Sequence, residues 1–270
     1  MARIKTLFWR IQQGIVFFFR AKTRYSVHSP FVSDFIKSVL CFRSIEIGTK
    51  IEQFRKKLLS DNRIIEITDF GAGYGGDQKK IRKISVSNVV KSSARTKRSG
   101  EFLARLAAWK KPQTALELGT NIGFSMLYLA TATPTTQWHT IEGSQSLATL
   151  AKQHFQQFNV AAHLYVGAFQ DTLPKILPQI APIDFVLIDG HHTAQAVVEL
   201  CQSIKPFLAP GAVVVIDDIR WTPDMLSAWS QIQQTPDFQV TIELFQTGIC
   251  VFNRPQAKQK FQLLCGETFC

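Results

Sequence analysis

A short run of acidic and glycine residues could bind a nucleoside ligand. Glu117 lies two residues before Gly119, and Gly123 follows between an apolar segment and a helical pattern. Glycine lets the backbone turn sharply, so a ligand can lie against the free N–H groups at a helix start. The turn lacks the Gly-Lys-Ser/Thr of a phosphate-binding loop, and a carboxylate in the preceding segment would repel a pyrophosphate. The pattern therefore predicts a ligand that carries positive charge.

A second carboxylate follows at a distance that suits a ribose. Glu142 ends the next apolar segment, 23 residues after Gly119. At the end of the second strand of such a unit, a carboxylate can accept both ribose hydroxyls. The two acids and the glycines together predict an adenosine ligand with a positive charge.

A similar segment, Asp69 to Gly76, competes for this interpretation. It also follows an apolar run at 64–68 and matches Gly-x-Gly-x-Gly. No strand ending in an acid follows about 20 residues later, as a ribose-binding unit would require. Residues 69–98 are instead interpreted as a flexible basic loop with short helices, either a lid over the site or a surface excursion.

The elements that must position these residues alternate regularly after Pro112. Each strand is followed by a helix, which predicts an α/β fold with a parallel sheet covered by helices on both faces. A hairpin at 238–245 and 249–252 would add a reversed last strand, giving a Rossmann-like sheet of seven strands. The other predicted strands are 114–118, 138–141, 162–166, 183–188 and 212–216, and the helices between them are 123–132, 145–158, 170–180, 193–207 and 223–234.

Acidic residues fall at the carboxyl ends of several predicted strands. Asp189 follows 183–188, and Asp217 and Asp218 follow 212–216. Ligands bind at this edge of a parallel sheet. We therefore expect these acids to share one rim with Glu142.

Five motifs in this order resemble those of the class I S-adenosylmethionine-dependent methyltransferases. They are Glu117-Leu-Gly-Thr-Asn-Ile-Gly123, Thr140-Ile-Glu142-Gly, Val166-Gly-Ala-Phe169, Asp184-Phe-Val-Leu-Ile-Asp189 and Val215-Ile-Asp-Asp218. The resemblance covers about residues 112–253 and is nearest to the catechol-type, metal-dependent O-methyltransferases. It implies a methyltransferase that binds S-adenosylmethionine. The residues that it implies as contacts of this cofactor are Glu117, Gly119, Thr120, Asn121, Gly123, Glu142, Gly143, Ala168, Phe169 and Asp189.

The same resemblance implies a catalytic set. Asp189, Asp217 and Asp218 match the positions that hold a divalent cation, and carboxylate oxygens suit Mg²⁺ or Ca²⁺. His192 stands where that subset has its general base, and histidine titrates near neutral pH. The pair is Asp-Asp rather than Asp-Asn, and a histidine replaces the more usual lysine. Trp221 is expected either to line the acceptor pocket or to pack in the core.

The N-terminal part differs sharply in charge. Residues 1–112 hold 24 of the 31 Lys and Arg but 8 of the 20 Asp and Glu, whereas residues 113–270 are net acidic. We expect a helical, basic extension or lid at 1–111 and the methyltransferase domain at 112–270. The basic part resembles uncharacterised bacterial methyltransferases. It predicts either a solvated surface or contact with an anionic partner.

Helical spacing of apolar residues over 3–20 predicts a helix that docks on the core or lies on a membrane surface. Its apolar run is too short to span a bilayer, and no signal-peptide cleavage site follows. The five cysteines are odd in number and lack metal-ligand spacing, so a reducing, cytoplasmic setting is expected.

The leading hypothesis is methyl transfer, most simply to oxygen, with a small-molecule acceptor whose identity the sequence does not give. A non-catalytic RNA- or membrane-binding protein on the same fold is the alternative, and an NAD-dependent oxidoreductase fits the sheet but not the loop.

Overall fold

A computed structural model describes residues 2–40, 46–69, 80–93, 95–191 and 193–264. The chain forms two compact units. Unit 1 contains Met1–Phe42 and Val186–Cys270, and unit 2 contains Arg43–Phe185. The first 42 residues thus pack with the C-terminal part of the chain. The domain boundary expected at residue 111 coincides with neither unit boundary, and a separate N-terminal domain stays a prediction.

The sheet is Rossmann-like and mostly parallel, as expected. Within the described residues its strand order is β10-β8-β9-β7-β6-β3-β4-β5. β3, β4 and β5 pair in parallel, whereas β9 runs antiparallel to both β7 and β8. β9 is the reversed strand that the sequence predicts. β10 is an eighth strand that it does not, and it pairs in parallel with β8.

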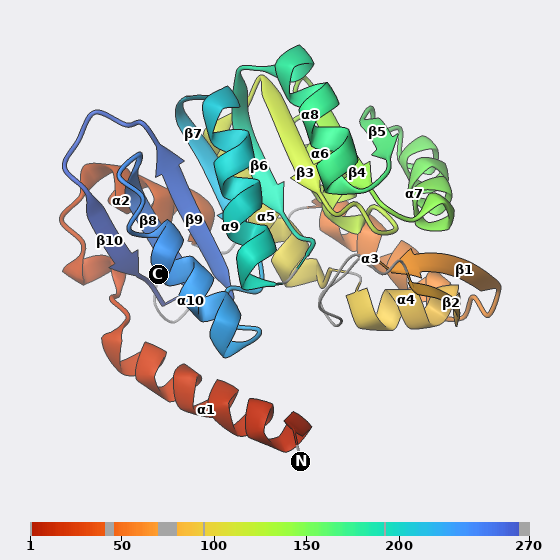
Figure 1. The fold of residues 1–270 in the computed structure, drawn as a ribbon, viewed down its shortest axis with the longest axis horizontal. Helices are drawn as coiled ribbons and strands as arrows, with labels where there is room; N and C mark the ends of the chain where they lie inside the picture. The colour runs from red at the N-terminus through yellow and green to blue at the C-terminus, as the bar shows by residue number, and fades with distance from the viewer. Residues whose placement is uncertain (1, 41–45, 70–79, 94, 192, 265–270) are drawn as a thin grey trace. The chain divides into compact units, whose positions relative to one another are not determined.

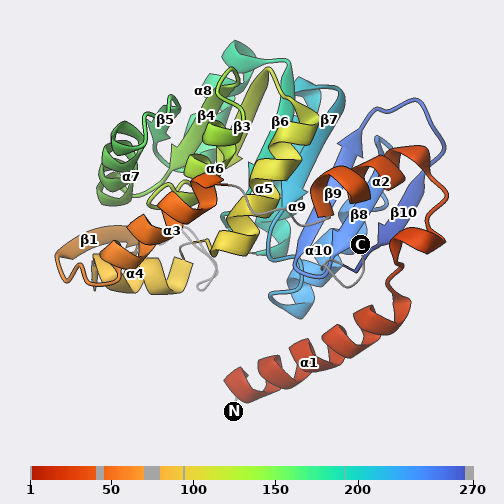
Figure 2. The same cartoon turned by 180° about the vertical axis from the view of Figure 1, so that it is seen from behind.

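Unit 2 contains the glycine turn and the elements around it (Figure 1). α8 covers one face of its strands, and α5 and α6 cover the other (Figures 1 and 2). Its elements are α3 (Glu46–Leu58), β1 (Ile64–Asp69), β2 (Lys80–Ser85), α4 (Val86–Ser93), α5 (Lys97–Lys110), β3 (Thr114–Leu118), α6 (Phe124–Ala132), β4 (Gln137–Glu142), α7 (Gln145–Gln157), β5 (His163–Val166) and α8 (Phe169–Ile180).

Unit 1 contains the strands that end in aspartates. α9 and α10 cover one face of its strands, and α2 covers the other (Figures 1 and 2). Its elements are α1 (Ala2–Arg20), α2 (Pro30–Phe35), the π-helical turn Ile36–Leu40, α9 (Ala194–Ile204), β7 (Leu208–Ile216), α10 (Pro223–Ile232), β8 (Phe238–Leu244), β9 (Thr247–Phe252) and β10 (Gln259–Gln262). β6 (Ile183–Ile188) contains the unit boundary.

Local sequence explains why these elements begin and end where they do. Thr96 caps α5 by accepting a hydrogen bond from the N–H of Ser99, and Lys111 ends that helix in a left-handed conformation. Thr222 caps α10 in the same way, with Pro223 at the first helical position. β6 and the second half of β7, residues 212–216, are largely apolar and buried on both faces.

Residues 69–98 differ from the expectation of a flexible loop. β1 pairs with β2 in an antiparallel hairpin outside the main sheet, and α4 follows directly. β2 carries basic residues on both faces, with Ile81 and Ile84 on opposite sides of the strand, so its sequence shows no alternation of apolar and polar residues. The short helix was expected. Gly71 to Gly76, the competing glycine segment, lies outside the described residues.

None of the helices within the described residues has the length and apolar character needed to cross a bilayer.

Candidate functional site

The glycine turn between β3 and α6 is built from left-handed residues. Gly119 has a φ of 102°, Asn121 of 52° and Gly123 of 87°. The N–H groups of Gly119 and Thr120 both donate to the carbonyl of Ile141 in β4, at 3.1 and 3.2 Å. The turn is therefore held against the end of the neighbouring strand, as a ligand-binding loop at this edge requires.

Gly123 is required by both conformation and space. A Cβ at this position would meet Cε1 of Phe155 at 2.6 Å and Cβ of Ala151 at 3.3 Å, both on α7. Its positive φ disfavours any side chain as well. The glycine thus lets α6 begin directly beside α7.

The carboxylate of Glu117 is completely buried beneath the turn. Ser125 Oγ donates to one of its oxygens, and Thr140 Oγ1 donates to the other at 2.6 Å. Because the single hydroxyl proton of Thr140 is used there, Thr120 Oγ1 must donate to Thr140 Oγ1, 2.5 Å away. A chain of hydroxyl groups therefore fixes this buried acid and joins the turn to β4.

Glu142 connects the turn to the start of α7. Its two carboxylate oxygens accept from the N–H groups of Asn121 and Ser144, at 2.7 and 2.8 Å. Gly143 lies between the acid and Ser144. A carboxylate at the end of the second strand can accept ribose hydroxyls. The site residues of this unit therefore fit an adenosine ligand.

The end of β5 joins the same cluster. Gly167 N–H donates to the carbonyl of Glu142 at 3.0 Å, and the glycine has a φ of 152°. Ala168 caps the start of α8, and Phe169 is buried at its first position. The structure thus brings the ends of β3, β4 and β5 together around Glu142, and nine of the ten predicted contact residues are distributed over them. The tenth, Asp189, belongs to unit 1 and follows β6.

His154 supports this cluster and was not expected from the sequence. Its Nδ1 donates to the carbonyl of Ile122 at 2.7 Å, and its ring meets Phe54 of α3 edge-on at 4.8 Å between centroids. Burial lowers the pKa of His154 below its usual value, so the neutral ring is favoured. His154 lies in the third turn of α7, and no sequence pattern predicts that a histidine there would hydrogen-bond to the loop before α6.

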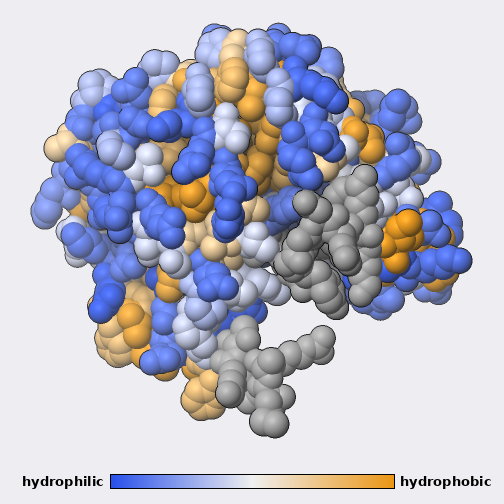
Figure 3. Space-filling model, in the orientation of Figure 1, coloured by the Kyte–Doolittle hydropathy of each residue, from blue (hydrophilic) through white to orange (hydrophobic). Residues whose placement is uncertain are grey.

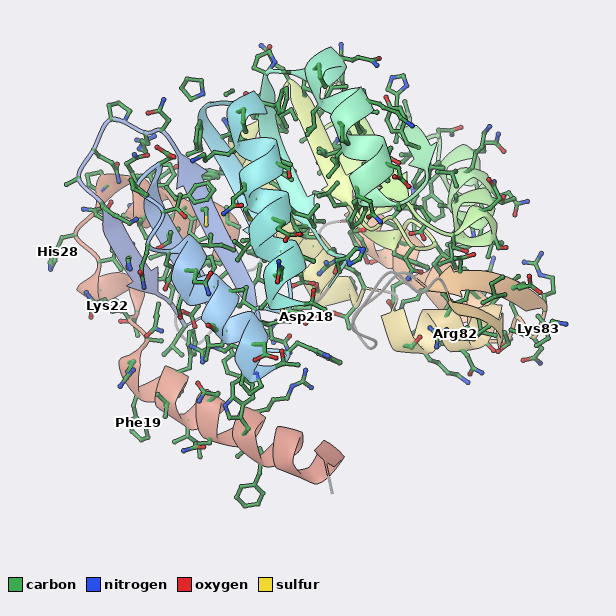
Figure 4. The ribbon with its side chains drawn as sticks, viewed as in Figure 1. Phe19, Lys22, His28, Arg82, Lys83 and Asp218 are labelled. Carbon is green, nitrogen blue, oxygen red and sulfur yellow. The ribbon has the colours of Figure 1, made fainter. Side chains whose placement is uncertain are left out.

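The aspartates of unit 1 lie at the ends of β6 and β7, as predicted. The N–H of Asp217 donates to the carbonyl of Ile188 at 3.0 Å, and Asp217 Oδ1 accepts from Thr247 Oγ1 at 3.1 Å. Asp218 has a φ of 55° and its carbonyl accepts from Trp221. All three aspartates are partly exposed, and Figure 4 shows Asp218 at the end of its strand.

These carboxylates do not form a recognisable metal site. In the described part of the chain, no group of three or more His, Cys, Asp or Glu side chains is placed to hold a metal ion. His192, the predicted base, lies outside the described residues. Its neighbour His191 adopts a left-handed conformation with a φ of 52°.

Trp221 serves a packing role on the surface. Its side chain is 45% exposed, and the guanidinium of Arg10 in α1 stacks over its ring at 3.9 Å from the centroid. Such a cation–π contact holds a helix in place without burying it. The described contacts favour packing of this tryptophan rather than a pocket wall.

Comparison with known proteins agrees with this geometry. Residues 116–219 match the family model described as a methyltransferase domain, which begins beside the glycine turn and ends after the aspartate pair. Over this stretch the chain is similar to methyltransferase domains. The family resemblance predicted from the motifs is therefore confirmed.

Relatives of the methyltransferase domain include two bacterial catechol O-methyltransferases. The protein from Mycobacterium tuberculosis is 33% identical over 123 residues, covering 44% of this chain and 54% of the relative. The protein from Niastella koreensis is 27% identical over 124 residues, covering 44% and 55%. The chain thus spans about half the length of the curated relatives that it matches.

Solved structures resemble the fold over a longer stretch. The O-methyltransferase TomG from Streptomyces achromogenes, in complex with S-adenosylmethionine, has a TM-score of 0.56 at 21% identity, covering 82% of this chain and 96% of its own. An O-methyltransferase from Bacillus cereus, in complex with S-adenosylhomocysteine, has a TM-score of 0.56 at 17% identity, covering 82% and 97%. At these identities the likeness shows the fold.

Proposed function

We propose that the protein transfers the methyl group of S-adenosylmethionine to an oxygen atom of a small acceptor. The observation that carries this proposal is the joining of three strand ends around Glu142, beside the buried carboxylate of Glu117. Relatives of the domain are named O-methyltransferases, which supports oxygen as the acceptor atom. The same names disfavour the non-catalytic alternative.

When bound, the cofactor supplies an electrophilic methyl group on a sulfonium, with a neutral thioether as leaving group. The residues of unit 2 then need only hold the ligand in one orientation. Glu142 would accept the ribose hydroxyls, and Glu117 places negative charge below the turn, which would favour a cationic ligand. Such fixed positioning, with water excluded, provides much of the rate gain in group transfer.

On the acceptor side, His192 is proposed as the base that removes the hydroxyl proton. Asp189, which ends β6, would hold that hydroxyl or the histidine. A neutral histidine can accept a proton near pH 7. It would thereby assist the deprotonation of an alcohol or phenol, which is slight at that pH without a base. These roles rest on the family resemblance and on the position of Asp189 at a strand end.

The cofactor proposal is tested by calorimetric titration with S-adenosylhomocysteine. Wild-type protein is expected to bind, and Glu142→Gln is expected to bind roughly 10- to 100-fold more weakly, as loss of a charged hydrogen-bond acceptor predicts. Glu199→Gln, an exposed change on α9, is the matched control and should bind as wild type does. Absence of binding by the wild-type protein would reject the proposed function.

A divalent cation at Asp189, Asp217 and Asp218 is a separate part of the proposal. Their oxygen chemistry suits Mg²⁺ or Ca²⁺, although the described residues form no group of three or more His, Cys, Asp or Glu side chains that could hold a metal ion. A bound cation predicts a higher melting temperature in Mg²⁺ or Ca²⁺ than in a chelator. It also predicts that Asp217→Ala, which removes a ligand oxygen, abolishes the difference. Equal melting in both conditions removes the cation from the proposal.

A further inference from the structure

α1 contacts the rest of unit 1 through a largely polar face. Gln13 Oε1 accepts from Arg220 Nη1 at 2.7 Å, and Arg10 makes the stacking contact described above. The apolar member of this face is Phe17, which is buried and meets Phe245 edge-on at 5.4 Å between ring centroids. These contacts recur at helical spacing, so they fix which side of α1 faces the protein.

The opposite face of α1 is apolar and points away from unit 1. Each of its residues lies three or four positions from another member, which places them in one stripe along about three turns. Figure 3 shows hydrophobic side chains along this helix, and Figure 4 shows Phe19 projecting away from the protein. The stripe consists of Phe8, Ile11, Ile15, Phe18 and Phe19, which are between 54% and 82% exposed.

The chain around the stripe is purely basic. Residues 1–33 contain six Lys and Arg, at 3, 5, 10, 20, 22 and 24, and the first acidic residue is Asp34. Arg20, Lys22 and Arg24 are exposed where the helix ends and the chain leaves it. An outward apolar stripe with cations at its end and no anions matches an anionic lipid surface in both hydrophobicity and charge.

We propose that α1 binds the surface of anionic membranes through the Phe8–Phe19 stripe. The helix would lie in the plane of the interface, with the stripe among the upper acyl chains and the basic side chains at the headgroups. The polar face stays on unit 1, held by Gln13 and Arg10. The protein is thereby attached to the membrane from one side without a spanning segment.

Other occupants fit this surface less well. A nucleic acid needs cations at the centre of its binding surface to neutralise phosphates, whereas the centre of the stripe is Ile11 and Ile15. A second copy of the chain would place two basic helices against each other, and like charges at an interface oppose association. A membrane rich in anionic lipid matches both properties, because its acyl chains can contact the apolar stripe and its headgroups can contact the basic side chains.

Flotation with vesicles tests the proposal on the full-length protein. Phosphatidylcholine vesicles containing a quarter phosphatidylglycerol should carry the protein, and pure phosphatidylcholine vesicles should carry much less. The double variant Ile15→Gln/Phe19→Gln should bind at least about 10-fold more weakly, because both changed side chains would leave the lipid. Binding by the wild type should also weaken as salt is raised.

The matched control is Ile64→Gln/Ile81→Gln, which changes two comparably exposed apolar side chains on the β1–β2 hairpin. It should float as wild type does, and both double variants should melt at the wild-type temperature. Equal flotation of the stripe variant and wild type overturns the proposal, as does failure to bind anionic vesicles at low salt. A dimer that the stripe variant abolishes, or RNA binding without lipid binding, assigns the surface to another partner and also overturns it.

Discussion

Gly123→Ala is expected to weaken S-adenosylhomocysteine binding by more than 10-fold and to lower the free energy of unfolding by about 2–5 kcal/mol. A residue with a Cβ is destabilised by the left-handed backbone conformation at this position. The added Cβ would also overlap the ring of Phe155. α6 would have to move away from α7 or the turn would have to change shape. Either response displaces the loop that Glu142 and Ile141 hold. Chemical denaturation and calorimetry measure the two effects.

Two further variants separate conformation from overlap. Gly211→Ala provides the backbone cost alone, because Gly211 has a φ of 76° and a Cβ there would meet nothing within 4 Å. It should cost about 1–2 kcal/mol and leave cofactor binding unchanged. Adding Phe155→Leu to Gly123→Ala should restore part of the binding. If Gly123→Ala binds the cofactor normally, the turn is not the ligand loop.

Glu243→Gln is expected to lower the free energy of unfolding by about 3–5 kcal/mol, because it breaks a buried ion pair and leaves Arg220 without its counter-charge. Both residues are nearly inaccessible to solvent. Arg220 donates to one carboxylate oxygen through Nε, at 2.8 Å, and through Nη2. The other oxygen accepts from Trp229 Nε1 at 3.0 Å and from Gln262 Nε2 at 3.2 Å. One carboxylate thus joins α10, β8, β10 and the loop after β7.

An exposed ion pair in the same unit is the matched control. Lys205 and Asp237 meet at 2.7 Å, but their side chains are 38% and 45% exposed. Asp237→Asn should therefore cost less than about 1 kcal/mol. Replacing both buried partners, as Arg220→Met with Glu243→Leu, should recover much of the stability lost in Glu243→Gln. A loss in Glu243→Gln no larger than in Asp237→Asn would contradict the assignment.

The regular part of the fold could be predicted because its signals are local. β6 and β7 are largely apolar, an aspartate follows each of them directly, and a helix comes a short distance later. The glycine turn was equally readable, since Gly119 and Gly123 must take backbone conformations that other residues avoid. A mostly parallel sheet covered by helices then followed from the alternation of strands and helices.

Other parts depend on contacts between distant residues. β10 is four residues with one aromatic, and it becomes a strand only because β8 offers an open edge. β2 has three basic residues among its six and no alternating apolar pattern, so its sequence does not predict a strand. The hydroxyls of Thr140 and Ser125 reach Glu117 only after the chain has folded, so their role has no pattern in sequence.

The orientation of α1 was also beyond the sequence. Periodicity shows that an apolar stripe exists, but not which side of the helix contacts the protein. Arg10, Gln13 and Phe17 find partners in the loop after β7 and in the turn between β8 and β9. Those specific contacts turn the larger apolar stripe outward, against the usual expectation that it would face the core.

The division of unit 1 between the two ends of the chain has a consequence for synthesis on the ribosome. Gln13 and its partner Arg220 are 207 residues apart. At about 5–20 residues per second, some 10–40 s pass between their translation. During that interval α1 has left the ribosome while its docking surface does not yet exist, so both of its faces are accessible. The nascent helix therefore meets chaperones or a lipid surface before it meets the rest of its own unit.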